Sequence, residues 1–150
     1  MNRFSHMLAV ALLALPLASA LSSAALAKDE TLYQRLGGYD AIAAVTDSFV
    51  GRLLEDDMFE RFFTGISNDS KMRLRQNIVD FFCKETGGPC YYVGRDMKTV
   101  HEGIGITKAE WDKATEHFVA AMQELQVPEQ EQNDAAALIQ PLEKDIVEAE

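Results

Sequence analysis

Residues 92–107 of the chain read YVGRDMKTVHEGIGIT and overlap a segment unlike the rest of the sequence. That segment, 86–105, holds five glycines and a proline and leaves room for only a short helix near 96–100, which is typical of a functional loop region. His101 comes at the end of the short helix, with Met97 one turn before it. A neutral imidazole here could point into a core and bind iron, although an ordinary core or surface histidine is the simpler interpretation of the residue pattern alone.

The chain before this segment has apolar residues at helical spacing. It predicts a short helix, a longer helix, an aromatic turn or helix and a second long helix, at about 32–36, 42–53, 58–63 and 68–86. Ser67 and Asn68 are both good N-caps for the last of these helices, and the glycines and proline at 87–89 break it.

The chain after the segment predicts two more helices. Thr107 and Glu110 form a capping box that opens the first of them. Pro128 suits the first turn of the last helix, which runs toward Val147 with a kink at Pro141. The sequence therefore predicts an all-α fold.

The first 27 residues predict a secretory signal peptide that is cleaved after Ala27. Arg3 gives a positive start, an apolar run covers 7–20, and Ala25-Leu26-Ala27 is a small-x-small cleavage signal. An uncleaved N-terminal anchor is the alternative, and it would have to bury three serines. We therefore expect 1–27 to be removed and 28–150 to form one exported domain, which in a bacterium would be periplasmic.

The expected domain is strongly acidic. Residues 28–150 carry 13 basic and 24 acidic side chains, a net charge of −11. Phosphate backbones and anionic membrane surfaces repel such a chain, so neither nucleic acid nor a membrane is an expected partner once the signal is removed.

Cys83 and Cys90 both lie in the part expected to be exported, where thiols are commonly oxidised in pairs. A structural disulfide is the favoured interpretation, with free buried thiols and redox or metal chemistry as alternatives. The Cys-x-x-Cys spacing and the neighbouring histidines that would indicate a redox or zinc site are missing from the sequence.

Five short motifs follow one another along the mature chain. They are Leu32-Tyr33-x-x-Leu36-Gly37-Gly38, Phe62-Phe63-x-Gly65, Thr86-Gly87-Gly88-Pro89, Tyr92-x-Gly94-Arg95-Asp96-Met97-Lys98-x-x-His101 and Gly103-x-Gly105-Ile106-Thr107. In this order and at this spacing they resemble the group I truncated haemoglobins, over about 31–147. Each glycine pair alone is weak evidence for the family. The block around His101, together with the other motifs, is specific for it.

The resemblance implies a truncated globin, a two-over-two helical sandwich around haem b with His101 as the proximal iron ligand. The other residues that it places at the haem are Phe63, Leu74, Arg75, Ile78, Tyr92, Met97 and Lys98. Of these, Tyr92, Lys98 and Arg75 are candidates for binding the haem propionates. A plain core role is the alternative for Phe63, and a solvated surface role is the alternative for Lys98 and Arg75.

The resemblance also implies which residues face the gas ligand. These distal residues are Phe49, Val50, Leu74, Asn77 and Ile78. Many relatives carry a tyrosine where this chain has Val50, so the expected pocket is apolar, with an open sixth iron position and no phenol to hold oxygen. Oxygen should then dissociate several-fold to about tenfold faster than from a pocket with such a donor, unless the amide of Gln76 or Asn77 swings in to donate a hydrogen bond.

Three functions are compatible with this sequence. The favoured one is reversible binding of oxygen, nitric oxide or carbon monoxide, because His101 lies within the family motif as the single axial ligand and the opposite face of the haem is expected to be open and apolar. Nitric oxide dioxygenation is the second, and it would need an electron-donor protein since no flavin or nicotinamide fingerprint is present. The third is a haem-free helical interaction module that kept the fold and lost the site.

Overall fold

The computed structural model describes residues 30–149, and the expected signal peptide at 1–27 lies outside this range. Its elements are α2 (Leu32–Arg35), α3 (Gly38–Glu55), η1 (Asp57–Phe59), α4 (Glu60–Phe63), α5 (Asn68–Glu85), α6 (Met97–His101), α7 (Lys108–Glu124), α8 (Glu129–Ile139), η2 (Gln140–Leu142) and α9 (Glu143–Ile146). The predicted all-α fold is confirmed. Within 30–149 the β contact is a single isolated bridge between Thr107 and Ala149.

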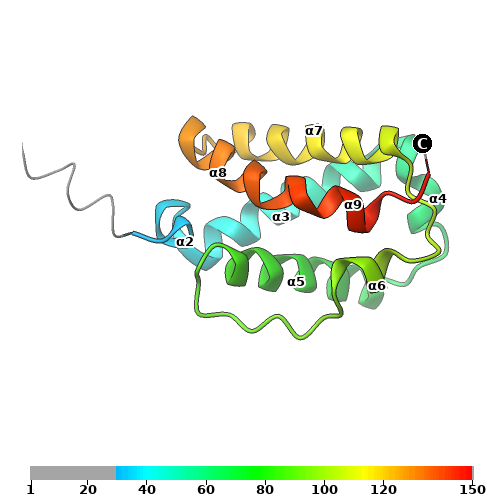
Figure 1. Ribbon diagram of the computed structural model, residues 1–150, viewed down its shortest axis with the longest axis horizontal. Helices are drawn as coiled ribbons and strands as arrows, with labels where there is room; N and C mark the ends of the chain where they lie inside the picture. Colours follow the sequence, from blue (N-terminus) through cyan, green and yellow to red (C-terminus); the bar gives the residue numbers. More distant parts are fainter. Residues whose placement is uncertain (1–29, 150) are drawn as a thin grey trace, which may run out of the picture.

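Two pairs of helices make up the body of the molecule (Figure 1). One pair is α3 with α5, and the other is α7 with the segment from α8 to α9. α3 also packs along α7, so it joins the two pairs, while α6 packs against α9. This is the two-over-two arrangement that the sequence predicts.

The core between the pairs is aromatic at its centre. Phe118 of α7 is buried, stacks on Phe82 of α5 at 5.0 Å between ring centroids, and meets the edge of Phe49 of α3 at 5.7 Å. Met122, Ala135 and other aliphatic side chains surround these rings. Because stacked and edge-to-face rings each stabilise a core beyond the area they bury, this cluster fixes how the two pairs meet.

Helix ends follow the capping signals in the sequence. Ser67 accepts a hydrogen bond from the N–H of Ser70 at the start of α5, and Asp96 accepts one from Thr99 at the start of α6. The capping box of Thr107 and Glu110 forms at the start of α7 as predicted.

Gly88 belongs to the turn that ends α5, and the turn requires a glycine. A Cβ at this position would lie 2.5 Å from the ring of Tyr33 and 2.7 Å from the carbonyl oxygen of Cys83, closer than real Cβ contacts. The close approach lets the short α2 segment lie against the end of α5.

The last predicted helix is interrupted once, at Pro141. Pro141 lies in the 3₁₀ turn η2, which separates α8 from α9, because a proline cannot donate the backbone hydrogen bond that a continuous helix needs. Pro128 lies at the N-cap of α8, one position before the first turn in which it was expected. Over the described range, every helix is too short or too polar to span a bilayer.

Candidate functional site

A cavity of about 410 Å³ lies inside the fold, within the range of small-molecule and cofactor sites. Helices α3 to α7 and the segment from α8 to α9 contribute to its wall. The wall is apolar and largely aromatic, and it includes Phe49, Leu53, Phe59, Phe62, Phe63, Leu74, Ile78, Phe81, Met97, Val100, Ile104, Ile106, Trp111 and Phe118. Phe63 and Met97, which were predicted to contact a porphyrin, are among them.

His101 is the histidine on the cavity wall. Its ring nitrogen Nδ1 lies 2.7 Å from the carbonyl oxygen of Met97, one turn earlier in α6. A carbonyl can only accept a hydrogen bond, so in the neutral imidazole Nδ1 carries the proton and Nε2 keeps a lone pair. Metal-binding histidines use this arrangement, in which the second ring nitrogen is held by an outer acceptor. His101 is thus prepared to bind a metal through Nε2.

His117 has a different environment. Its Nε2 lies 2.7 Å from a carboxylate oxygen of Asp56, and its ring packs 5.9 Å from that of Phe59. The backbone N–H of Met58 and then His117 hold the pKa of Asp56 below its ordinary value. His117 therefore has a structural partner at the end of α3, which leaves His101 as the candidate ligand.

Most of the predicted distal residues line the cavity. Phe49 of α3 and both Leu74 and Ile78 of α5 do so. Val50 is buried, with 7% of its surface exposed, but α3 presents Phe49 and Leu53 to the cavity in its place. The reason is helical geometry, since residues four apart share a face and the residue next to Phe49 points about 100° away.

The two amides that could donate a hydrogen bond to the gas, Gln76 and Asn77, differ in their contacts. Gln76 donates from Nε2 to the hydroxyl of Tyr39 at 2.8 Å and to the carboxylate of Asp80 at 2.9 Å, which holds it outside the cavity. Asn77 lies on the cavity wall, one turn from Leu74 and also exposed to solvent. Asn77 is therefore the amide that the structure brings to the site.

The three propionate candidates also have different positions. Tyr92 lines the cavity, and its hydroxyl donates to the carbonyl oxygen of Arg95 at 2.7 Å, while partial burial raises its pKa. Arg75 instead forms two hydrogen bonds, of 2.7 and 2.8 Å, with the carboxylate of Asp47. Lys98 is exposed and lies outside the cavity wall. Only Tyr92 of the three contacts the cavity.

Cys83 and Cys90 form a disulfide that joins the end of α5 to the loop before α6. Cys83 is completely buried. On the same side, the rings of Phe81 and Tyr92 meet edge to face at 5.5 Å, and both line the cavity. The disulfide therefore ties the loop that carries Tyr92 to the helix that carries Phe81.

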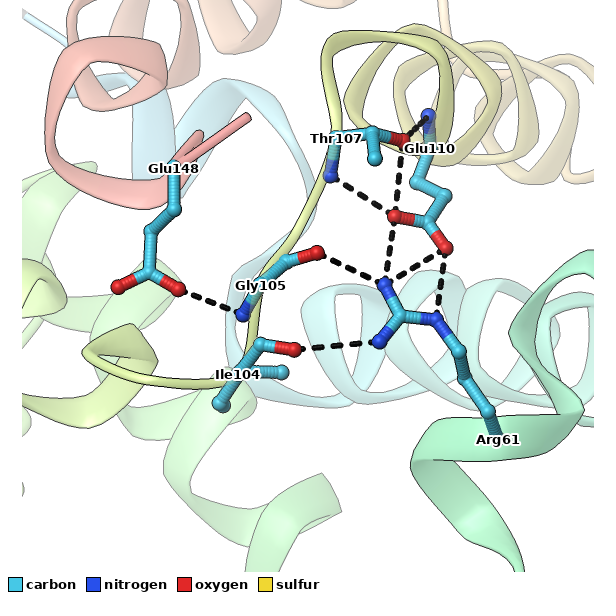
Figure 2. A network of polar contacts seen from close by, with 6 residues as sticks. All are labelled: Arg61, Ile104, Gly105, Thr107, Glu110 and Glu148. Carbon is cyan, nitrogen blue, oxygen red and sulfur yellow. Dashed lines mark hydrogen bonds and ion pairs between the residues drawn. The ribbon is translucent and has the colours of Figure 1, made fainter. Parts of the chain in front are cut away.

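Polar contacts surround the loop that follows α6 (Figure 2). Arg61 of α4 donates to the carbonyl oxygens of Ile104 and Gly105 at 3.2 and 2.8 Å, and its guanidinium also pairs with Glu110 of α7 at 2.9–3.0 Å. Glu110 in turn accepts from the N–H and the hydroxyl of Thr107, both at 2.8 Å. Burial raises the pKa of Glu110, but these hydrogen bonds outweigh it, so the pKa lies below its ordinary value.

Glu148 contacts the same loop from the C-terminal segment. Its carboxylate accepts from the backbone N–H groups of Gly103 and Gly105 at 2.7 and 2.5 Å. These two hydrogen bonds lower the pKa of Glu148. The N–H of Glu148 also donates to the carbonyl oxygen of Ile106 at 2.9 Å.

Arg61 and Glu148 are site residues that sequence reasoning missed. Their partners are backbone groups and a carboxylate more than 40 residues away, so no local pattern marks them. Glu110 was predicted as half of a capping box, and its pairing with Arg61 was not.

The donor set fits a porphyrin better than a bare metal ion. Between residues 30 and 149 no three or more histidine, cysteine, aspartate or glutamate side chains gather in a way that could hold an ion. A porphyrin brings four nitrogen ligands of its own and needs only one axial residue and an apolar, flat-walled cavity. His101 and the aromatic wall supply these features.

Comparisons with known proteins agree with this geometry. The family model of the bacterial-like globins matches residues 31–148. A group 1 truncated haemoglobin from Mycolicibacterium paratuberculosis is 34% identical over 124 residues, which cover 83% of this chain and 89% of the relative. The crystal structure of a truncated haemoglobin from Tetrahymena pyriformis in its Fe(III) form has a TM-score of 0.72 at 30% identity, covering 79% of this chain and 98% of that one.

A third similar structure is the 2/2 haemoglobin of Synechococcus, described as having covalently attached haem. Its TM-score is 0.71 at 27% identity, and the match covers 79% of this chain and 98% of that one. With the two-over-two fold, the apolar cavity and His101 in place, these matches show that the chain belongs to the bacterial-like globin family, as a group 1 truncated haemoglobin.

Proposed function

We propose that this protein binds haem b through His101 and reversibly binds a diatomic gas at an open sixth iron position. The family is one of haem proteins that bind such gases. The observation that carries the proposal is the 2.7 Å contact between His101 Nδ1 and the carbonyl oxygen of Met97, which leaves Nε2 free on the cavity wall. When bound, the haem supplies the iron that takes the gas.

The distal residues determine which gas is held well. Phe49, Leu74 and Ile78 offer no hydrogen-bond donor, and Gln76 is engaged elsewhere. Asn77 is the one distal candidate on the cavity wall with an amide, and its side chain is exposed to solvent rather than buried in the pocket. Oxygen gains about 0.5–1.5 kcal/mol from a donor in such a pocket, whereas carbon monoxide gains much less. The pocket therefore favours fast oxygen release over tight storage. Binding of nitric oxide or carbon monoxide depends less on the missing hydrogen bond.

We further propose that residues 1–27 direct export and that the site works outside the cytoplasm. The Cys83–Cys90 disulfide supports this, because such bonds persist in oxidising compartments and are rare in the cytosol.

The test is the absorption spectrum of the purified protein in the oxidised state, the reduced state, and the reduced state under carbon monoxide. We expect haem bands that shift with carbon monoxide and, for the reduced protein, an oxygen form that reverses on deoxygenation. Absence of any carbon monoxide form would contradict the proposal. A protein that stays colourless with added haem would favour the haem-free interaction module.

A further inference from the structure

The loop from Gly103 to Thr107 begins two residues after His101 and is intrinsically easy to deform. Gly103 and Gly105 have φ values of 78° and 69°, a conformation that glycine adopts freely. α6 itself is only five residues long, and a helix of one turn has little stability of its own. The position of His101 therefore depends on what holds the two ends of α6.

The N-terminal end of α6 has a local anchor. Asp96 accepts from the N–H of Thr99 at 2.9 Å and from its hydroxyl at 2.7 Å. The C-terminal end continues directly into the glycine loop, in which the N–H of Ile104 donates to the carbonyl oxygen of His101 at 3.1 Å. A shift of this loop is thus passed to His101 through one peptide segment.

We propose that Arg61 and Glu148, which we call the loop clamp, are positioning residues that hold this loop from two sides and thereby fix how His101 meets the iron. The inference rests on the proposed function, because it concerns the same histidine and the same cofactor. It goes beyond that function by assigning the alignment of the ligand to two charged side chains outside α6.

Glu148 engages the N–H groups of the loop. One carboxylate oxygen takes the N–H of Gly103 and the other takes that of Gly105, so a single side chain spans Ile104. The C-terminal segment that carries Glu148 is itself held in place, because the backbone N–H of Lys108 donates to the carbonyl oxygen of Ala149 at 3.0 Å. Figure 1 shows this segment ending beside the start of α7.

Arg61 engages the carbonyl groups of the same loop. It donates to Ile104 and Gly105 while Glu110, which is 8% exposed, holds the guanidinium in place (Figure 2). The guanidinium also lies 4.0 Å from the ring centroid of Phe62, a cavity residue. Hydrogen bonds to charged groups are the stronger kind, so the two residues together fix both polar faces of the loop.

The test compares Glu148→Ala and Arg61→Ala with two matched controls, in the haem-loaded chain for the two haem measurements and in the haem-free chain for hydrogen exchange. Glu116→Ala removes an exposed carboxylate of α7 paired with Lys113, and Arg52→Ala removes a surface arginine paired with Glu124, both without contact to the loop. Three quantities are measured: the iron–histidine stretching band of the reduced protein by resonance Raman spectroscopy, the rate of haem transfer to an excess of apomyoglobin, and amide hydrogen exchange at Gly103 and Gly105 in the haem-free chain.

We expect faster exchange at both glycines, a shifted or broadened iron–histidine band, and haem transfer up to about tenfold faster in the clamp variants. Direct outer partners of metal-binding histidines contribute about 10- to 100-fold in affinity, and the clamp acts on His101 only through the loop, so its effect belongs at the lower end of that range. Glu148→Gln, which keeps one acceptor oxygen, should fall between wild type and Glu148→Ala, and it replaces that variant if the alanine form does not fold. The controls should match wild type in all three measurements.

The inference is overturned if the clamp variants give the band and transfer rate of the controls, or if glycine exchange does not change. These outcomes differ from failure of the proposed function, in which the wild-type protein itself would show no iron–histidine band.

Discussion

At the residue scale, a single hydrogen bond prepares the site for its cofactor. The Met97 carbonyl oxygen holds Nδ1 of His101, so the ring cannot rotate freely and Nε2 is the nitrogen that would bind iron in the function we propose. The other wall residues contribute shape and exclude water rather than ligands. The properties of the site are therefore sensitive to any polar group added to that wall.

Ile78→Gln is expected to slow oxygen dissociation by about two- to tenfold, because a donor in the cavity contributes about 0.5–1.5 kcal/mol to holding oxygen. Ile78 lines the cavity one turn from Leu74, so a longer amide side chain there reaches the ligand side. Stopped-flow measurement of oxygen and carbon monoxide dissociation checks this. Ile78→Met is the control of similar length without a donor, and an equal effect of both variants would contradict the account.

The sequence predicted some site residues and missed others for a physical reason. His101, Phe63, Met97 and Tyr92 lie in or near local motifs, and the structure brings all four to one cavity. Arg61 and Glu148 were missed because their partners lie more than 40 residues away in the sequence. The pairing of the propionate candidate Arg75 with Asp47 of another helix depends on tertiary packing in the same way.

At the element scale, the loop before α6 depends on a covalent bond. The disulfide closes a short loop between residues seven apart in sequence and holds Tyr92 near α5. Removing this constraint gives the unfolded chain more freedom while the folded chain gains little.

Cys83→Ser with Cys90→Ser should lower the free energy of unfolding by about 2–3 kcal/mol. Urea denaturation followed by far-ultraviolet circular dichroism measures it, and the reduced wild-type protein is the control that should unfold at a similar urea concentration. A doubly substituted protein as stable as the oxidised wild type would refute this role.

Helix starts were more predictable than helix continuity. Ser67, Asp96 and Thr107 cap the helices through hydrogen bonds to residues only three positions away, which a sequence pattern contains. The final helix was expected to kink at Pro141 and instead divides into α8, η2 and α9. Whether a proline bends or divides a helix depends on what packs beside it, which local sequence does not specify.

At the scale of the whole molecule, six carboxylates of the acidic chain have partners that stabilise their ionised form. Lowered pKa values are shared by Asp47, Asp56, Asp96, Glu110, Glu124 and Glu148. A carboxylate whose pKa is lower in the folded state stabilises the fold above its unfolded pKa, and that contribution is lost as the pH falls through the folded value.

Glu110→Gln is therefore expected to be less stable than wild type near neutral pH and to lose less stability on acidification below 4.5, the ordinary pKa of this side chain. Thermal unfolding at a series of pH values from about 7 to about 3 checks the prediction. Glu143→Gln, at an exposed carboxylate of α9, is the control. Parallel pH profiles for Glu110→Gln and wild type would contradict it.

The central claim, that His101 binds the iron of a gas-binding haem, is tested most directly by replacing this side chain with glycine and returning imidazole from solution. We expect His101→Gly to lose or change the reduced and carbon monoxide spectra of wild type, imidazole to restore them, and His117→Ala to leave them unchanged. Wild-type spectra in His101→Gly without imidazole would contradict the account.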